Sequence, residues 1–417
     1  MALNWVWTGF FIVAFATAVV RWLLGEVGIF QALLTAMFDG ARAGFEISLG
    51  LAGIMALWLG LMRVGERAGM VELLARLAGP LLRRLFPAVP DGHPAQGAMT
   101  LNISANLLGL DNAATPLGLK AMQELQTLNR EPSGTASNAQ IMFVVMNTAG
   151  LTLIPTSVIA IRQSVALKQG LGAGFNAADI FLPTLLVTFA SLLAGVLAVA
   201  MAQRLPLWRA RLWLPLLAVG GLLAAAVAGL ARLPAERAAQ VAGTTGAAVI
   251  LGVVLLFLLA GTWRRVNMYD AFIDGAKEGF GVAVQIIPYL IAILVAIGVF
   301  RAAGCMDALL SAIGAGVATL GWNTDFLPAL PVGLMKVLSG AGARGLMIDV
   351  LQTHGVDSFV GRLAAIIQGS TETTFYVLAV YFGSVGVKHH RHALACALLA
   401  DAVGLVAAIG VGYAMWR

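Results

Sequence analysis

Apolar runs of about 20 residues recur along the whole chain, and they restrict it to folds in which helices cross a lipid bilayer. Of the 417 residues, 60% are hydrophobic and 11% are charged, whereas soluble domains carry about 25% charge. Helices satisfy the hydrogen bonds of the backbone internally, as a bilayer requires. We therefore predict an all-α polytopic membrane protein with apolar spans at residues 5–24, 44–62, 181–201, 212–230, 242–259, 282–300 and 392–415.

The basic residues indicate the orientation of the chain in the membrane and not a nucleic-acid function. The net charge is +6, but the arginines and lysines are scattered through the loops between spans, where they set topology. The side that holds Arg63, Arg67, Arg76, Arg83 and Arg84 has the larger excess and is predicted to be cytoplasmic. We expect a multi-pass protein of the cell (inner) membrane. The first apolar run is too long for a signal-peptide core and is expected to remain as a helix.

Two polar stretches interrupt the apolar pattern. Residues 102–118 carry three asparagines, an aspartate and a proline, and residues 368–376 place Glu372 among serine and threonine residues. In lipid, such segments survive only when they are buried in protein or line a wet cavity. We interpret both stretches as parts of a binding site. The alternative is that they are polar surface loops between spans.

The first stretch is predicted to contain a re-entrant hairpin. Its tip is placed at residues 109–116, with Thr115 and Pro116 starting the returning helix, because proline is favoured at the first helical position. The glycine-rich residues 339–342 are its downstream counterpart, where glycines permit a tight turn.

Two further segments depart from a plain span. Residues 138–161 are predicted to form a span that is broken near Asn147 and again at Pro155, because a proline frees a carbonyl that needs another partner. Residues 70–86 have a helical apolar stripe and a charged face, and they are predicted to lie at the membrane interface or against the bundle.

Glu372 is the sharpest candidate for a functional residue. A carboxylate within a membrane segment is costly unless it has a role, so it is predicted to bind a polar solute or cation, or to exchange a proton. The alternative is a structural ion pair with Lys336 or Arg344. Amides and hydroxyls elsewhere suit neutral polar ligands such as bases or riboses. The predicted substrate-binding set is Asn102, Asn106, Asp111, Asn112, Thr115, Asn147, Thr148, Thr152, Lys336, Ser339, Gln368, Ser370, Thr371, Glu372 and Thr373.

Other motifs exclude several chemistries. Asp111 is either a second carboxylate of the site or a cap for the returning helix. His389, His390 and His392 lie beside basic residues at a span end, which favours a solvated cap over a metal site. The chain has no phosphate-binding P-loop, no HExxH zinc motif and no Gly-x-Ser-x-Gly elbow. We therefore predict no enzyme activity, no catalytic residue, no metal site and no cofactor.

An internal repeat relates two parts of the chain. Residues 38–45 (Phe-Asp-Gly-Ala-Arg-Ala-Gly-Phe) resemble residues 273–280 (Ile-Asp-Gly-Ala-Lys-Glu-Gly-Phe), at an offset of 235 residues. If the hairpin is re-entrant, an odd number of spans separates equivalent points, which inverts the second part. Two inverted repeats with broken helices are typical of secondary transporters. The alternative is chance similarity among glycine- and alanine-rich segments.

We assign one repeat to residues 1–203 and the other to residues 243–417. Residues 204–242 form a linker with an extra transmembrane helix.

The motifs also resemble a known family. Four segments resemble spore maturation protein A, namely residues 46–60, 83–94, 109–124 and 153–162. The third of them includes Gly-Leu-Asp-Asn-Ala-Ala-Thr-Pro-Leu-Gly. Four other segments resemble spore maturation protein B, namely residues 278–280, 328–331, 336–340 and 368–376. The last of them reads Gln-Gly-Ser-Thr-Glu-Thr-Thr-Phe-Tyr. The resemblance covers nearly the whole chain and implies a natural fusion of the two.

Both halves are thereby identified as members of the nucleoside-recognition or Gate domain family, which is similar to parts of concentrative nucleoside transporters and of the ferrous-iron permease. This resemblance implies a core like that of the nucleoside transporters. Asp111 departs from the family pattern, in which a small residue such as glycine is expected, and it adds an acid to the site.

Our leading functional hypothesis is a secondary transporter or permease for a small polar solute, nucleoside-like compounds first, with its site at the interface of the two repeats. Coupling would be to H⁺ or Na⁺. One alternative is a divalent metal-ion permease that uses Asp111 and Glu372. Another is a non-transporting membrane scaffold or sensor in envelope or spore maturation. The expected partners are the lipid bilayer, the solute and a second copy in a homodimer, with no nucleic acid.

Overall fold

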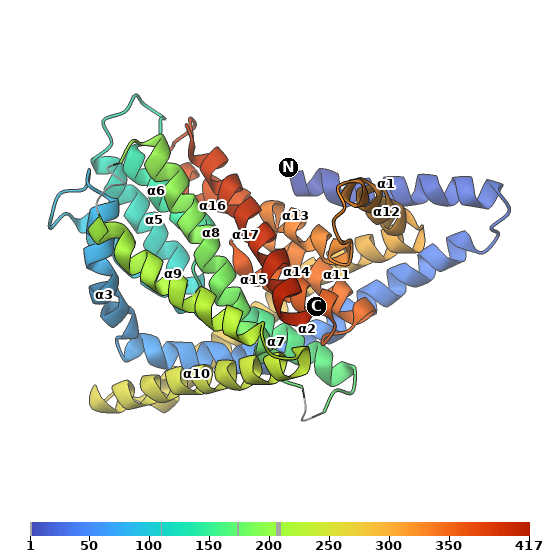
Figure 1. Ribbon diagram of the computed structural model, residues 1–417, viewed down its shortest axis with the longest axis horizontal. Helices are drawn as coiled ribbons and strands as arrows, with labels where there is room; N and C mark the ends of the chain where they lie inside the picture. The colour runs from blue at the N-terminus through green and yellow to red at the C-terminus, as the bar shows by residue number, and fades with distance from the viewer. Residues whose placement is uncertain (1, 110, 173–174, 206–209) are drawn as a thin grey trace.

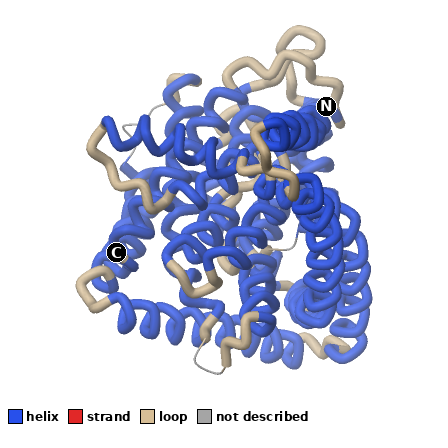
Figure 2. Tube along the Cα trace, turned by 90° about the vertical axis from the view of Figure 1, so that its right-hand side faces the viewer, coloured by secondary structure: helices blue, strands red, loops and turns tan. Residues whose placement is uncertain are grey.

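The computed structural model describes residues 2–109, 111–172, 175–205 and 210–417, with the side chains of residues 2–4, 111–113 and 210–215 left out. This described part is built of helices joined by loops (Figure 2). Within it, the segments long and apolar enough to cross a membrane are Trp5–Leu23, Ile29–Arg67, Ala177–Ala202, Ala235–Trp263, Met268–Ala302, Phe359–Gly383 and Ala393–Trp416. The chain is thus an all-α, multi-pass membrane protein, which confirms the predicted fold class.

The order of the helices repeats along the chain (Figure 1). The first series is α1 (Ala2–Leu23), α2 (Ile29–Arg67), α3 (Met70–Leu85), α4 (Pro94–Leu107), α5 (Asp111–Thr127), α6 (Asn138–Thr148), α7 (Thr156–Lys168), a 3₁₀ turn η1 (Ala177–Ile180) and α8 (Phe181–Ala202). The helix α9 (Ala210–Leu230) follows. The second series is α10 (Ala235–Trp263), α11 (Met268–Ala302), α12 (Cys305–Thr319), η2 (Leu327–Ala329), α13 (Leu330–Leu338), α14 (Gly340–His354), α15 (Phe359–Ser370), α16 (Thr374–Gly383) and α17 (Ala393–Trp416).

Each series contains the same kinds of element. A span and a very long helix come first, followed by a shorter helix, a tight helical hairpin, a helix broken in its middle and a closing span. The hairpins are α4–α5 and α13–α14, and the broken helices are α6–α7 and α15–α16. The inverted orientation of the two series stays a prediction.

The long helices α2 and α11 lie side by side (Figure 1) and approach each other through glycine. A Cβ atom at Gly40 would lie 2.9 Å from the carbonyl oxygen of Leu294, and one at Gly275 would lie 2.3 Å from the carbonyl oxygen of Leu59. No larger residue fits at such distances. Small residues spaced four apart let transmembrane helices approach this closely, and Gly44 continues the same stripe, since its Cβ would lie 2.9 Å from a backbone nitrogen of α11.

These contacts follow the offset of the sequence repeat. The 235-residue shift that pairs Gly40 with Gly275 also pairs Leu59 with Leu294, so each of the two glycine contacts is the counterpart of the other. Such reciprocity is the pattern expected of two elements related by a two-fold axis. The repeated Asp-Gly-Ala-basic-X-Gly-Phe motif is therefore the surface through which α2 and α11 contact each other.

Both long helices extend beyond the spans predicted from hydropathy. The predicted spans start at residues 44 and 282, whereas the helices begin at Ile29 and Met268. Hydropathy ends a span where charges appear, but here charges are paired, Arg42 with Glu46 within α2 and two carboxylates of α11 with arginines of α2. Arg63 donates to Glu278 over 2.5 Å and Arg67 donates to Asp274 over 2.7 Å.

The first hairpin also turns earlier than predicted. Gly109 has a left-handed φ of 71°, which ends the incoming helix, and the returning helix begins at Asp111. The prediction that Thr115 and Pro116 start this helix is wrong, because Pro116 lies inside it. The glycine reverses the chain first, and the proline is then accommodated within an existing helix.

Replacing Gly279 of α11 by alanine should destabilise the protein, because its Cβ would lie 2.5 Å from the carbonyl oxygen of Met55. Overpacking of this kind costs about 1–3 kcal/mol, so we expect a lower melting temperature in detergent. Gly281→Ala is the matched control, since a Cβ there meets nothing within 4 Å and alanine is the better helix former by about 1 kcal/mol. Equal melting temperatures for the two variants would contradict the close approach of these helices.

Candidate binding site at two helix breaks

Two broken helices meet in the interior and are hydrogen-bonded to each other. The first break lies between Thr148 and Thr156, and the second lies between Ser370 and Thr374. The backbone N–H of Glu372 donates to the carbonyl oxygen of Thr148 over 2.9 Å. The two breaks thus satisfy part of each other's exposed backbone, which is a condition for irregular structure within a membrane protein.

The first break is held from two sides. Gly150 has a φ of +36°, and a Cβ there would lie 2.7 Å from Cγ of Glu372, so glycine permits the close contact with the second break. On the other side, the N–H of Leu153 donates to the carbonyl oxygen of Leu107 at the end of α4, over 2.8 Å. The hairpin and both breaks therefore form one connected unit.

A cavity of about 70 Å³ lies between the breaks and the two hairpins. Of the predicted site residues, Thr152, Lys336, Gln368, Thr371 and Glu372 line it. A buried water needs roughly 10–15 Å³ of such space, whereas pockets for drug-sized ligands measure roughly 300–1,000 Å³. In this conformation the cavity holds a few waters or one small group, and a whole nucleoside does not fit.

Two acceptors in this cavity are unsatisfied among the described residues. The Oε1 atom of Gln368 is buried without a hydrogen-bond partner. Neither an ion pair nor a side-chain hydrogen bond engages the carboxylate of Glu372 within the described chain, so the alternative of a structural ion pair is not realised. Lys336 and Arg344 nevertheless line the same cavity. The arrangement offers acceptors for N–H or O–H groups beside two positive charges.

The predicted asparagines form a network of their own. Asn106 donates to the side-chain oxygen of Asn147 over 2.8 Å, and the hydroxyl of Tyr381 donates to the same oxygen over 3.3 Å. Asn102 donates to the carbonyl oxygen of Ala114 over 2.8 Å. These amides join α4, α5, α6 and α16, and they do not line the cavity. Sequence reasoning missed Tyr381, whose aromatic ring fits the apolar pattern of its helix.

Several predicted hydroxyl groups satisfy the backbone of their own segments. Thr148 and Ser370 donate to carbonyls one turn earlier in their helices, over 2.9 and 2.7 Å. Ser339 caps α14 by accepting from the N–H of Gly342 over 3.0 Å. Thr373 contacts the second hairpin at Gly340.

The remaining predicted residues are Thr115, Asp111 and Asn112. Thr115 has an interaction within the protein but does not line the cavity. The side chains of Asp111 and Asn112 lie outside the described residues.

Asp401 of α17 is a candidate that sequence reasoning missed. It is 8% exposed, its Oδ2 atom accepts from the hydroxyl of Thr374 over 2.6 Å, and its Oδ1 atom has no partner within the described chain. It lines a second cavity, of about 190 Å³, that shares Lys336 and Thr371 with the first. The signal was present, because Asp401 is a lone carboxylate within a long apolar run.

Arg162 directly follows the span predicted at residues 138–161, and it does not lie in an exposed loop as the basic residues were predicted to do. Its guanidinium group is fully buried, pairs with Asp179 and donates to the carbonyl oxygen of Ala177 over 2.7 Å. Arg362 donates to the other oxygen of Asp179 over 2.7 Å. An arginine just beyond an apolar run resembles a topogenic residue in sequence, whereas the fold places it in an ion cluster that links α7, η1 and α15.

The histidine segment is less solvated than predicted. The ring of His390 stacks on Phe382 at 4.8 Å between centroids, and His389 joins the loop before α6 through its backbone. The pKa of His390 is lowered, mainly by burial and then by His389, and that of His392 is lowered by burial and then by Arg391. Among the described residues, no three His, Cys, Asp or Glu side chains group as metal ligands would.

Comparison with known proteins identifies the family. A family model named Gate, described as nucleoside recognition, matches residues 48–164 and 283–388, which together exceed half of the chain. The chain belongs to the Gate family. Each match contains one hairpin region and one helix break, so the family pattern includes both sides of the cavity.

Two curated relatives agree with this assignment. Spore maturation protein B of Bacillus subtilis (strain 168) is 44% identical over 162 residues, which are 39% of this chain and 89% of that protein. Spore maturation protein A of the same organism is 39% identical over 170 residues, which are 41% of this chain and 83% of that protein. The matches are consistent with a fusion of the two. No solved structure matches the chain.

Replacing Asp179 by asparagine should leave Arg162 buried without its counter-charge. Breaking a buried ion pair in this way costs about 3–5 kcal/mol, and we expect a large fall in the melting temperature. Asp325→Asn is the control, because its pair with Arg417 is 36% and 50% exposed and such pairs contribute about 0–1 kcal/mol. Similar losses in both variants would contradict the stabilising role of the cluster.

The histidine segment should make the protein less stable in acid. Since the fold lowers the pKa of His390 and His392, their contribution is complete above the unfolded value of about 6.5 and is lost as the pH falls below it. We expect the melting temperature to drop between about pH 7 and pH 5. The double variant His390→Gln/His392→Gln should show a shallower drop, and an unchanged slope would contradict this assignment.

Proposed function

We propose that this chain is a permease for a small polar solute, which binds where the two helix breaks meet, and that it acts in the cell (inner) membrane. The observation that carries this proposal is a half-buried carboxylate, Glu372, beside the buried and unsatisfied Oε1 of Gln368, in one polar cavity inside a multi-pass membrane protein. Intramembrane carboxylates with such surroundings are functional sites by default. The family description supports nucleoside-like compounds as the first class to test.

The small volume implies that the described conformation is closed to solutes of nucleoside size. Admitting one would require the breaks to move apart, starting with the contact between Glu372 and Thr148. Hairpins and broken helices are the elements that move in alternating access. Coupling to H⁺ or Na⁺ would use a second carboxylate, and Asp401 occupies the neighbouring cavity for that role.

A non-transporting scaffold or sensor is the second candidate. It is favoured by the size of the cavity and by the self-satisfied network of Asn106, Asn147 and Tyr381, both of which suit a closed and rigid interior. The relatives named as spore maturation proteins fit either role. A divalent-cation permease is disfavoured, because a cation would enter the cavity beside Lys336 and Arg344.

A thermal-shift panel on the purified chain tests the proposal with nucleosides, nucleobases, amino acids and divalent cations. A solute at 100 times its dissociation constant should stabilise the protein by about 2.7 kcal/mol. Glu372→Gln should abolish this shift by removing the charged acceptor. Glu236→Gln, at an exposed carboxylate in the first turn of α10, should leave it unchanged.

The outcomes separate the two candidates. A saturable shift lost only in Glu372→Gln supports the permease and identifies the solute class. A shift that survives in that variant contradicts the assigned site, and a flat panel favours the scaffold.

A further inference from the structure

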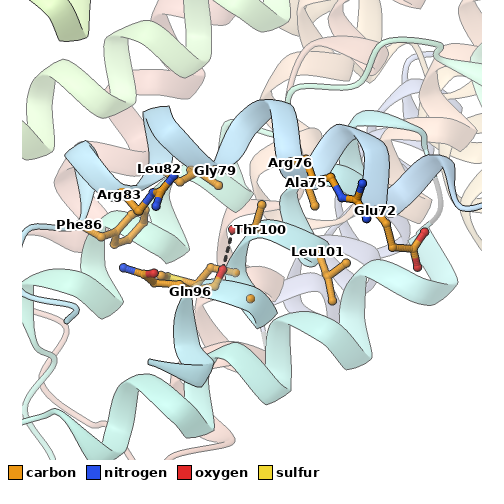
Figure 3. Close-up of a pocket in the computed structure, with 12 residues that line it drawn as sticks. Glu72, Ala75, Arg76, Gly79, Leu82, Arg83, Phe86, Gln96, Thr100 and Leu101 are labelled. Atoms are coloured by element: carbon orange, nitrogen blue, oxygen red, sulfur yellow. Dashed lines mark hydrogen bonds between the residues drawn. The ribbon is translucent and has the colours of Figure 1, made fainter. Parts of the chain in front are cut away.

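A groove of about 430 Å³ lies between α3 and α4, apart from the cavity at the helix breaks (Figure 3). Its floor is apolar and includes Leu82, Phe86 and Met99, which are buried. Gly79 lines one wall and Gly97 the other, and a Cβ at either position meets nothing within 4 Å. The middle of the groove is therefore open space with an apolar base, of the size that small-molecule pockets have (roughly 300–1,000 Å³).

The two ends of this groove differ in charge. Figure 3 shows Arg83 near Gln96 at one end, and Arg76 near Glu72 at the other. Arg83 is exposed and has no acidic partner among the described residues. The side-chain nitrogen of Gln96 donates two long hydrogen bonds in the described chain, of 3.4 Å to a backbone carbonyl and 3.5 Å to Asp91, and its oxygen accepts from Gly92 over 3.4 Å. The Arg83 end thus presents a guanidinium without an acidic partner, beside an amide whose hydrogen bonds are long and weak.

The surroundings of α3 indicate what covers the groove. Leu77 and Leu73, on the outer side of this amphipathic helix, are 70% and 44% exposed. Exposed leucines beside a terminal pair of arginines suit acyl chains along the helix and head groups at its end. The excess of basic residues predicts that this arginine-rich segment lies on the cytoplasmic side, where membrane lipids carry negative charge.

We propose that the groove between α3 and α4 binds one anionic phospholipid, with its phosphate at Arg83 and Gln96 and an acyl chain along the floor past Gly79. The guanidinium donates to the phosphate oxygens in a charge-assisted hydrogen bond. The apolar floor formed by Leu82, Phe86 and Met99 excludes water from the chain. This inference is independent of whether the chain transports a solute.

Native mass spectrometry of the full-length chain in mild detergent tests it. The protein is titrated with phosphatidylglycerol or with phosphatidylcholine of the same acyl chains. We expect one phosphatidylglycerol per chain, bound about fivefold more tightly than phosphatidylcholine, the effect of one arginine beside an anionic head group. Arg83→Gln should remove this preference. Arg76→Gln is the matched control on the same helix, and it should keep the preference because Arg76 lies at the Glu72 end.

A second pair of variants tests the groove itself. Gly79→Leu should fill it without changing charge, and binding of both lipids should be lost, whereas Gly53→Leu, at another open helical position, should bind as the wild type does. The proposal is overturned if the two lipids bind equally, if Arg76→Gln is as damaging as Arg83→Gln, or if Gly79→Leu binds normally. Displacement of the lipid by millimolar inorganic phosphate would also overturn it, by showing a site for free anions.

Discussion

The close approach of α2 and α11 is the constraint on which the rest of the structure depends. Backbone atoms of each helix lie where a side chain of the other would stand, at Gly40 and Gly44 on one and at Gly275 and Gly279 on the other. In lipid there is no hydrophobic force between helices, so backbone proximity and dispersion contacts drive their association. Each long helix is followed, after one shorter helix, by a hairpin and a broken helix, and fixing the pair brings the two series of elements together.

The helix breaks show how a membrane protein compensates irregular backbone. Each break exposes carbonyl and amide groups that lipid cannot satisfy. Here the backbone N–H of Glu372 in one break donates to the carbonyl oxygen of Thr148 in the other. The backbone N–H of Leu153 donates to the carbonyl oxygen of Leu107 at the end of α4. The polar side chains then divide into two groups. The asparagines with Tyr381 hold the elements together, although Oδ1 of Asn102 has no partner in the described chain. Gln368 and Glu372 instead present their acceptors to a cavity.

Buried charge in this protein follows the same division. Asp179 lies between Arg162 and Arg362, and its two oxygens are both engaged. Both carboxylate oxygens are thus used in fixing the packing of α7 and α15, although Nε of Arg162 is buried without a partner in the described chain. Glu372 and Asp401 differ because each keeps carboxylate oxygen without a partner in the described chain. We therefore distinguish a structural carboxylate from a candidate functional one by whether both of its oxygens have partners, and not by how deeply it is buried.

The sequence by itself determined the helical membrane fold, the two hairpin regions, both helix breaks and the repeated glycine motif, because these depend on local hydropathy, on proline and glycine, and on motif spacing. It also singled out Glu372, since a carboxylate within a predicted membrane segment is costly unless it has a role. Only the tertiary structure decided which polar side chains face one another. In sequence, an asparagine that holds helices together looks the same as one that binds a ligand. Only the contacts show that Asn102, Asn106 and Asn147 form hydrogen bonds within the protein itself. The pairing of Arg162 and the site of Asp401 likewise depend on partners far away in the chain, and local sequence carries no information about distance in space.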